Sequence, residues 1–128
     1  MIKSIQQFSE KGIEKIEKAT DIFYGDPEKM AEFVYAIRDE VIDLGIAIIG
    51  ETFDAMDDFL RENRKKRADW TIVRRDDAHI MTSLGNVSYH KTLYKSKSDG
   101  HHEYLVDRLM GIAPHEKMTE DALASLLE

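Results

Sequence analysis

Residues 30–66 read MAEFVYAIRDEVIDLGIAIIGETFDAMDDFLRENRKK, and this stretch decides the fold. Apolar side chains recur in it every three or four residues from Met30 to Leu60, and no proline interrupts it. This spacing predicts one amphipathic helix that ends near residue 66. At about 1.5 Å per residue such a helix would be roughly 60 Å long, which is more than a single small domain can cover with its own mass.

The middle of the predicted helix, LGIAIIG at residues 44–50, is apolar on all sides, and its small residues allow another helix to approach closely. A second copy of the chain is the simplest partner, so we expect a homodimer. The residues expected at the dimer interface are apolar positions of this helix: Ile37, Val41, Leu44, Ile48 and Phe53. In the alternative, Gly45 or Gly50 bends the helix into two pieces that fold back on the preceding helix. The sequence leaves both arrangements open.

Upstream of this stretch, apolar residues at helical spacing from Ile2 to Phe23 predict a first amphipathic helix. The sequence Tyr24-Gly25-Asp26-Pro27-Glu28 then ends one helix and starts another. Glycine is typical of a helix C-terminus, aspartate of an N-cap and proline of the first helical position.

Downstream, the apolar pattern changes to the period of β-strands. Residues 70–75, 78–83 and 87–94 are expected to be antiparallel strands, followed by a returning strand at residues 103–107. Thr119 is expected to cap a final helix. We therefore predict an α+β fold with two N-terminal helices, the second very long, a small antiparallel β-meander and a short C-terminal helix. Residues 1–128 form a single module in this prediction, with helices at 1–66, strands at 69–108 and the start of a truncated helix at 118–128.

Composition excludes several classes of protein. Apolar residues make up 42% of the 128 positions and charged residues 34%, as in acidic globular proteins. The chain has no cysteine, so it has no disulfides, no thiolate metal site and no cysteine nucleophile. We find neither a membrane span nor a signal peptide and expect a cytoplasmic protein without membrane contact.

Charge is distributed unevenly along the chain. Residues 1–63 contain 7 bases and 15 acids, whereas residues 64–108 contain 10 bases and 6 acids. The basic side chains gather where the long helix is expected to end, and such a cluster can contact DNA phosphates. The expected DNA-binding residues are Arg61, Arg64, Lys65, Lys66, Arg67, Arg74 and Arg75. The alternative is a solvated surface whose bases only complement the helix dipole.

The sequence offers little support for a catalytic or metal site. Its five histidines lack the spacing of metal ligands, and no phosphate-binding loop or nucleophile elbow is present. Asp76-Asp77 is expected to be a turn rather than a pair of catalytic acids. We therefore expect no metal, no cofactor and no catalytic residue in this stretch.

Two motifs carry a family resemblance. TSLGNVSYHKTLY at residues 82–94 and YLVDRLMGI at residues 104–112 resemble the N-terminal region of ISLre-type insertion-sequence transposases. The resemblance covers essentially the whole chain and includes Arg74-Arg75-Asp76 before the first motif. The second motif departs from the family at Arg108, where members typically carry a carboxylate, and we attach no functional meaning to the change.

The resemblance implies that the chain is the N-terminal module of a longer transposase. Family members resemble the DDE class, in which acidic residues downstream hold divalent metals, so none of those catalytic residues falls on this sequence. The expected function is therefore to bind the ends of a DNA element and to pair two protomers during transposition. The alternative is a purely structural homo-oligomerisation module that makes no contact with DNA.

Overall fold

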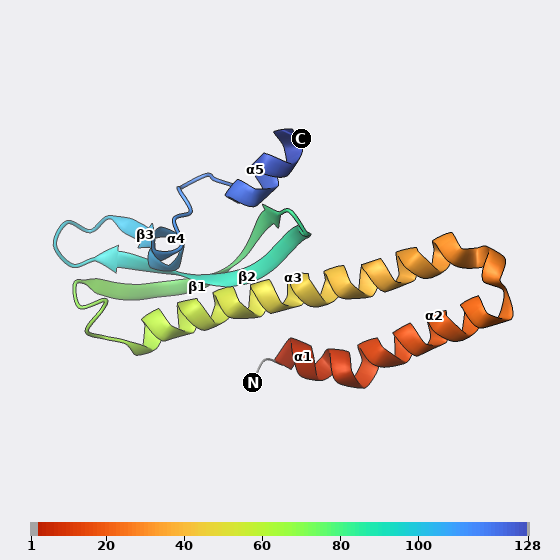
Figure 1. Ribbon diagram of the computed structural model, residues 1–128. Coiled ribbons are helices and arrows are strands. Elements are labelled where there is room, and N and C mark those ends of the chain that lie inside the picture. The colour runs from red at the N-terminus through yellow and green to blue at the C-terminus, as the bar shows by residue number, and fades with distance from the viewer. Residues whose placement is uncertain (1–2, 128) are drawn as a thin grey trace. The chain divides into compact units, whose positions relative to one another are not determined.

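The computed structural model describes residues 3–127 and has the predicted α+β architecture (Figure 1). Helices come first, an antiparallel sheet follows, and a short helix comes last. The elements in chain order are α1 (Lys3–Gln7), a π-helical segment (Phe8–Gly12), α2 (Ile13–Gly25), a 3-10 turn (Pro27–Lys29), α3 (Met30–Glu62), β1 (Trp70–Thr82), β2 (Gly85–Ser96), β3 (His102–Tyr104), α4 (Leu105–Leu109) and α5 (Glu120–Leu127). They form two compact units, one up to Ile48 and one from Ile49 onward.

In the first unit, α2 and the first half of α3 are joined at the break that the sequence predicts. Asp26 caps the new helical segment, because its carboxylate accepts a hydrogen bond from the amide of Glu28 at 3.3 Å. On either side of this break, Phe23 and Phe33 stack with their ring centroids 4.9 Å apart. Further along, the Lys15 ammonium lies 3.7 Å from the Glu40 carboxylate. These contacts hold the two helices together along one line.

Helix α3 is one continuous element, so the alternative of a bend at Gly45 or Gly50, which the sequence left open, does not occur. Glycine is nevertheless needed at position 50, where α3 meets β2. A Cβ atom there would lie 2.6 Å from the carbonyl oxygen of Ser88, which is closer than atoms of a packed interior approach. The helix ends at Glu62 rather than near residue 66, because residues 64–69 form turns that the Arg67 side chain holds against the last carbonyls.

The three strands form an antiparallel sheet in the order β1-β2-β3. The prediction of two short strands at 70–75 and 78–83 is wrong, because β1 runs unbroken from Trp70 to Thr82 with a bulge between Ile72 and Arg74. Asp76 and Asp77 therefore lie within the strand and not in a turn. The outer edge of β1 is paired, among residues 3–127, only through the bridge between Met81 and Met118.

The returning strand is shorter than predicted and gives way to a helix. Strand β3 ends at Tyr104, and residues 105–109 form α4. Leu105 and Val106 are both buried, together with Leu60 and Tyr94. Adjacent side chains of a strand point to opposite faces, whereas adjacent side chains of a helix can face the same core. Burying both residues in one cluster therefore favours the helix.

The C-terminal helix is attached to the hairpin between β1 and β2. The Asp121 carboxylate accepts a hydrogen bond from the amide of Ser83 at 2.8 Å, and the amide of Thr119 donates to the carbonyl of Met81 at 2.9 Å. Ala122 is buried. The last residue of the predicted helix, Glu128, lies outside the described residues.

Candidate nucleic-acid interface

The basic cluster begins where α3 ends, and one of its members is used to end the helix. The Arg67 guanidinium donates hydrogen bonds to the carbonyls of Leu60 at 3.1 Å and of Arg61 at 2.8 Å. The last carbonyls of a helix have no partner within the helix, and a cation near them also complements the helix dipole. Arg67 therefore stabilises the end of α3, and its charge faces the protein.

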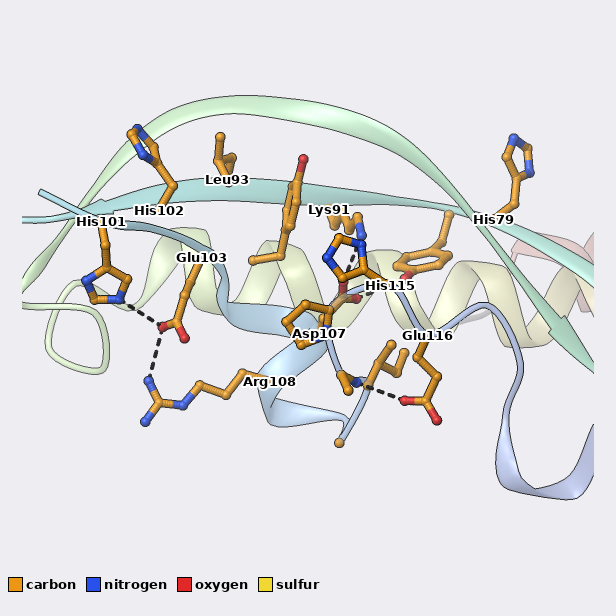
Figure 2. Close-up of a pocket in the computed structure, with 16 residues that line it drawn as sticks. His79, Lys91, Leu93, His101, His102, Glu103, Asp107, Arg108, His115 and Glu116 are labelled. Atoms are coloured by element: carbon orange, nitrogen blue, oxygen red, sulfur yellow. Dashed lines mark hydrogen bonds and ion pairs between the residues drawn. The ribbon is translucent and has the colours of Figure 1, made fainter. Parts of the chain in front are cut away.

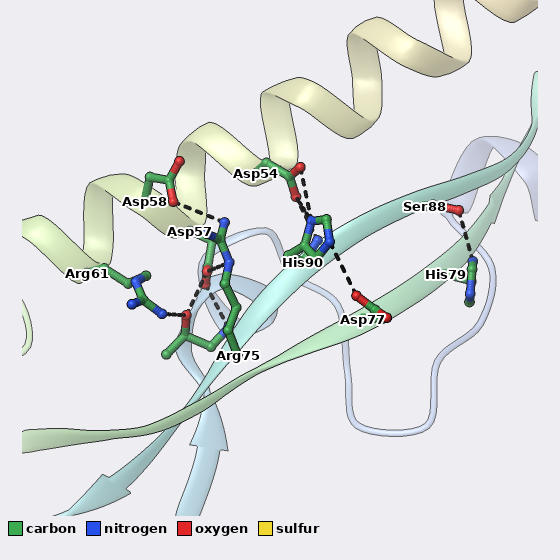
Figure 3. A network of polar contacts seen from close by, with 10 residues as sticks. Asp54, Asp57, Asp58, Arg61, Arg75, Asp77, His79, Ser88 and His90 are labelled. Atoms are coloured by element: carbon green, nitrogen blue, oxygen red, sulfur yellow. Dashed lines mark hydrogen bonds and ion pairs between the residues drawn. The ribbon is translucent and has the colours of Figure 1, made fainter.

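Two further arginines belong to a network between α3 and the sheet (Figure 3). Arg75 on β1 lies 3.3 Å from a carboxylate oxygen of Asp57 and 3.0 Å from one of Asp58. The Arg61 guanidinium donates a hydrogen bond to the Thr92 hydroxyl at 3.2 Å. Both cations thus have acceptors inside the protein.

Arg74 points to a different carboxylate. Its Nε atom lies 2.9 Å from Asp76, which also accepts a hydrogen bond from the Tyr104 hydroxyl at 2.7 Å. The hydrogen bond from Tyr104, with that from Arg74, lowers the pKa of Asp76. Asp76 in turn raises the pKa of Arg74. The charge of Arg74 is thus partly neutralised by its neighbour two residues away.

The other three bases of the cluster face solvent. Arg64, Lys65 and Lys66 are exposed on the turn after α3, and none of them forms an ion pair with a described residue. Lys66 lies over the Phe59 ring, 5.3 Å from its centroid. Arg64 and Lys65 line a shallow hollow with Phe59, Glu62 and Asn63. Three adjacent cations therefore remain available for an external anion.

One histidine that was not expected from the sequence is held between two acids (Figure 3). The amide of His90 donates to Asp54 at 2.6 Å, its Nδ1 lies 3.2 Å from the same carboxylate, and its Nε2 lies 3.2 Å from Asp77. This arrangement ties α3, β2 and β1 together. Among the described residues, no group of three or more His, Asp or Glu side chains is placed to hold a metal ion.

A second missed feature is a cavity of about 890 Å³ beside β2, β3 and α4 (Figure 2). Asp107, at its wall, accepts a hydrogen bond from the Tyr89 hydroxyl at 2.9 Å and pairs with the Lys91 ammonium at 2.8 Å. Lys91 also lies 4.1 Å from the centre of the Tyr104 ring. Burial and the bond to Asp107 raise the pKa of Tyr89. The charged groups at this wall satisfy one another, so the arrangement stabilises the fold.

The five residues predicted at a dimer interface fall into two environments. Ile37, Val41, Leu44 and Ile48 lie on the first half of α3, where Val41 is 55% exposed and the other three are half-buried. Phe53 lies on the second half and packs edge-on against the Tyr89 ring, with the ring centroids 5.3 Å apart. Phe53 therefore has a partner within its own chain. No described helix has the length and hydropathy to span a membrane.

Comparison with known proteins gives one family. The model of an uncharacterised protein family, UPF0236, matches residues 27–128. Similar proteins of Caldanaerobacter subterraneus subsp. tengcongensis are 30% identical over 99 residues, which is 77% of this chain and about a fifth of each relative. Three of these relatives are UPF0236 proteins. Their names combine four, two and eleven TTE designations. No solved structure matches the chain.

Proposed function

The chain belongs to the UPF0236 family, and from this premise we propose that it is the DNA-contacting N-terminal module of a transposase. The observation that carries the proposal is the group of three adjacent exposed cations, Arg64, Lys65 and Lys66, directly after α3. In the proposed role these side chains contact the phosphates at the ends of a DNA element. The chain spans about a fifth of the length of the relatives it matches, and the proposal covers DNA contact alone, without the strand-transfer chemistry.

The names of the relatives favour a mobile gene. One name joins eleven designations of a single series in one organism, and others join four and two. We interpret these designations as copies of one gene, which is the state that an element able to copy itself would leave. This interpretation agrees with the motifs at residues 82–94 and 104–112, which resemble ISLre-type transposases.

DNA contact through three cations and DNA contact through seven predict different salt dependences of the affinity. The proposal can therefore be tested by measuring that dependence. The logarithm of the affinity for duplex DNA falls with the logarithm of salt concentration, with a slope of about −0.9 per neutralised phosphate. Contact through Arg64, Lys65 and Lys66 alone predicts a slope of about −2.7, whereas contact through all seven expected bases predicts about −6. We propose the smaller set, because Arg61, Arg67, Arg74 and Arg75 have acceptors within the chain.

The test is a titration of a labelled duplex across a salt series with the wild-type chain and two variants. The first variant changes Arg64, Lys65 and Lys66 to Glu and is expected to lose binding. The second changes Lys11, Lys18 and Lys29 to Glu, which alters the net charge equally at exposed positions of the other unit, and is expected to retain binding. Equal loss in both variants would contradict a localised contact. Duplexes taken from DNA flanking the gene, compared with scrambled ones, measure specificity.

The second candidate is a structural homo-oligomerisation module that does not touch DNA. It is favoured by the acidic helical part, where residues 1–63 contain 15 acids and 7 bases. It is also favoured by the internal acceptors of four of the seven expected DNA-binding bases. Absence of binding at low salt, together with a stable dimer, would select this function instead.

A further inference from the structure

The first half of α3 carries a second apolar pattern, with a period of seven residues. Apolar side chains alternate at spacings of four and three over about 27 Å of helix. In heptad notation, positions a hold Val34, Val41 and Ile48, and positions d hold Met30, Ile37 and Leu44. Two helices that share this repeat can wrap around each other with these side chains interlocked. We call these six residues the α3 seam.

Three of the six residues of the α3 seam are exposed within the chain, and Ile37, Leu44 and Ile48 are half-buried. Met30, Val34 and Val41 are 58%, 54% and 55% exposed. Helix α2 contacts α3 through Phe33 and Glu40, which precede the a positions and lie to one side of the seam. A helix turns by about 100° per residue, so the centre of the seam lies roughly 60–70° around the helix from this line of contact. A contiguous row of exposed apolar side chains such as Met30, Val34 and Val41 is typical of an interaction site.

The residue types at the a positions of the seam favour pairing with one further helix of the same kind. β-Branched residues at a with Leu at d favour two-stranded coiled coils, and here all three a positions are β-branched and one d position, Leu44, is Leu. A parallel arrangement in register places each residue beside its own copy. On one flank of the seam the e positions hold Ala31, Arg38 and Gly45, so two of the three offer no bulk against the approach of another helix.

We propose that residues 30–48 of α3 pair with the same residues of a second copy as a parallel, in-register, two-stranded coiled coil. This interface adds Met30 and Val34 to the residues predicted from sequence and leaves out Phe53, which packs on Tyr89. The proposal rests on the α3 seam alone and not on the contact with DNA. Loss of DNA binding in a protein that still dimerises would therefore overturn only the proposed function.

Cysteine cross-linking tests the orientation directly, since the chain contains no cysteine of its own. Met30→Cys and Ile48→Cys are placed at opposite ends of the seam. In the parallel arrangement each single variant forms a disulfide-linked dimer with itself under oxidising conditions. In an antiparallel arrangement neither does, and only a mixture of the two variants cross-links. That result, or no cross-link in any sample, would overturn the proposal. Tyr35→Cys, exposed on α3 but outside the seam, is the control and remains uncross-linked.

Mass measurement tests the pairing itself. The wild-type chain is expected at twice its 14.8 kDa, and the double variant Val34→Asp/Val41→Asp at 14.8 kDa. Both residues are exposed within one chain, so the monomer is expected to keep its helical circular dichroism. Tyr35→Asp, a charge placed one residue from the seam, should leave the dimer intact. A monomeric wild type, or a double variant that still dimerises with unchanged affinity, would contradict the proposed interface.

Discussion

Asp57 of α3 accepts two hydrogen bonds from Thr92 of β2, one from its amide at 2.9 Å and one from its hydroxyl at 2.7 Å. Both residues are fully buried, and the Arg75 guanidinium lies 3.3 Å from the same carboxylate. A buried carboxylate is tolerated only when it is paired and hydrogen-bonded in this way. The contact fixes the position of the second half of α3 along β2, because moving the helix would separate all three groups.

Replacing Asp57 is expected to destabilise the second unit. Asp57→Ala leaves the buried amide and hydroxyl of Thr92 without their acceptor, and each such loss costs about 1–3 kcal/mol. We expect the free energy of unfolding in urea to fall by about 2–4 kcal/mol. Asp58→Ala removes the neighbouring acid, which is half exposed, and should change it by less than about 0.5 kcal/mol. Similar losses of unfolding free energy in both variants would mean that the buried hydrogen bonds of Asp57 contribute no more to stability than the exposed ion pair of Asp58.

A second prediction concerns the close approach at Gly50. Alanine normally stabilises a helix interior by about 1 kcal/mol relative to glycine. Gly50→Ala should do the opposite, because its Cβ would collide with the backbone oxygen of Ser88, and overpacking of this kind costs about 1–3 kcal/mol. Thermal unfolding measures whether the substitution raises or lowers the melting temperature. Gly25→Ala is the control, since a Cβ there meets no atom within 4 Å. An unchanged or raised melting temperature for Gly50→Ala would show that α3 can move away from β2.

The basic cluster should separate into residues that hold the fold and residues that do not. Arg67→Ala removes the hydrogen bonds to the last carbonyls of α3 and is expected to cost about 1–2 kcal/mol. Arg64→Ala changes an exposed side chain with no ion pair among the described residues, so its unfolding free energy should match that of the wild type. Urea denaturation of the two variants measures the difference. Equal unfolding free energies of the two variants would contradict the structural role proposed for Arg67.

The attachment of α5 should depend on pH through Asp121. Interactions with the Thr119 and Ser83 hydroxyls, and then with the Ser83 amide, lower the pKa of Asp121 well below its ordinary value of 3.8. Because the folded pKa lies below the unfolded one, the stabilisation is fully present above 3.8 and is lost as pH falls through the folded value. The amide resonance of Ser83 should therefore shift in acid, below pH 3.8. Asp121→Asn should abolish this titration, and its persistence in that variant would assign it to another group.

The elements that depend on local chemistry were predictable from sequence, and long-range contacts were not. Tyr24-Gly25-Asp26-Pro27 specifies its own break, because these residues act on the adjacent backbone. The contact between Asp57 and Thr92 joins residues 35 positions apart, and no local pattern encodes it. One signal was present: Asp57 interrupts the apolar stripe formed by Phe53, Met56 and Leu60, where a buried side chain is expected.

Long-range contacts also explain why two segments in the second half of the chain differ from their prediction. Asp76-Asp77 has the composition of a turn, yet its two side chains find partners in Tyr104 on β3 and His90 on β2, so the strand continues through them. Leu105 and Val106 fall within the returning strand that the sequence predicts at residues 103–107. Their joint burial against Leu60 and Tyr94 selects a helix instead. Tertiary contacts therefore decided both segments.

The outer edge of β1 has a consequence for solubility. An unpaired edge strand is a template on which further chains can add, and growth of that kind leads to fibrils. On β1 the four consecutive charged residues Arg74, Arg75, Asp76 and Asp77 and the bulge between Ile72 and Arg74 oppose such addition, because an incoming strand would have to accommodate their charges and a broken register. The sheet therefore ends at β1, and the exposed edge is protected against amyloid-like stacking.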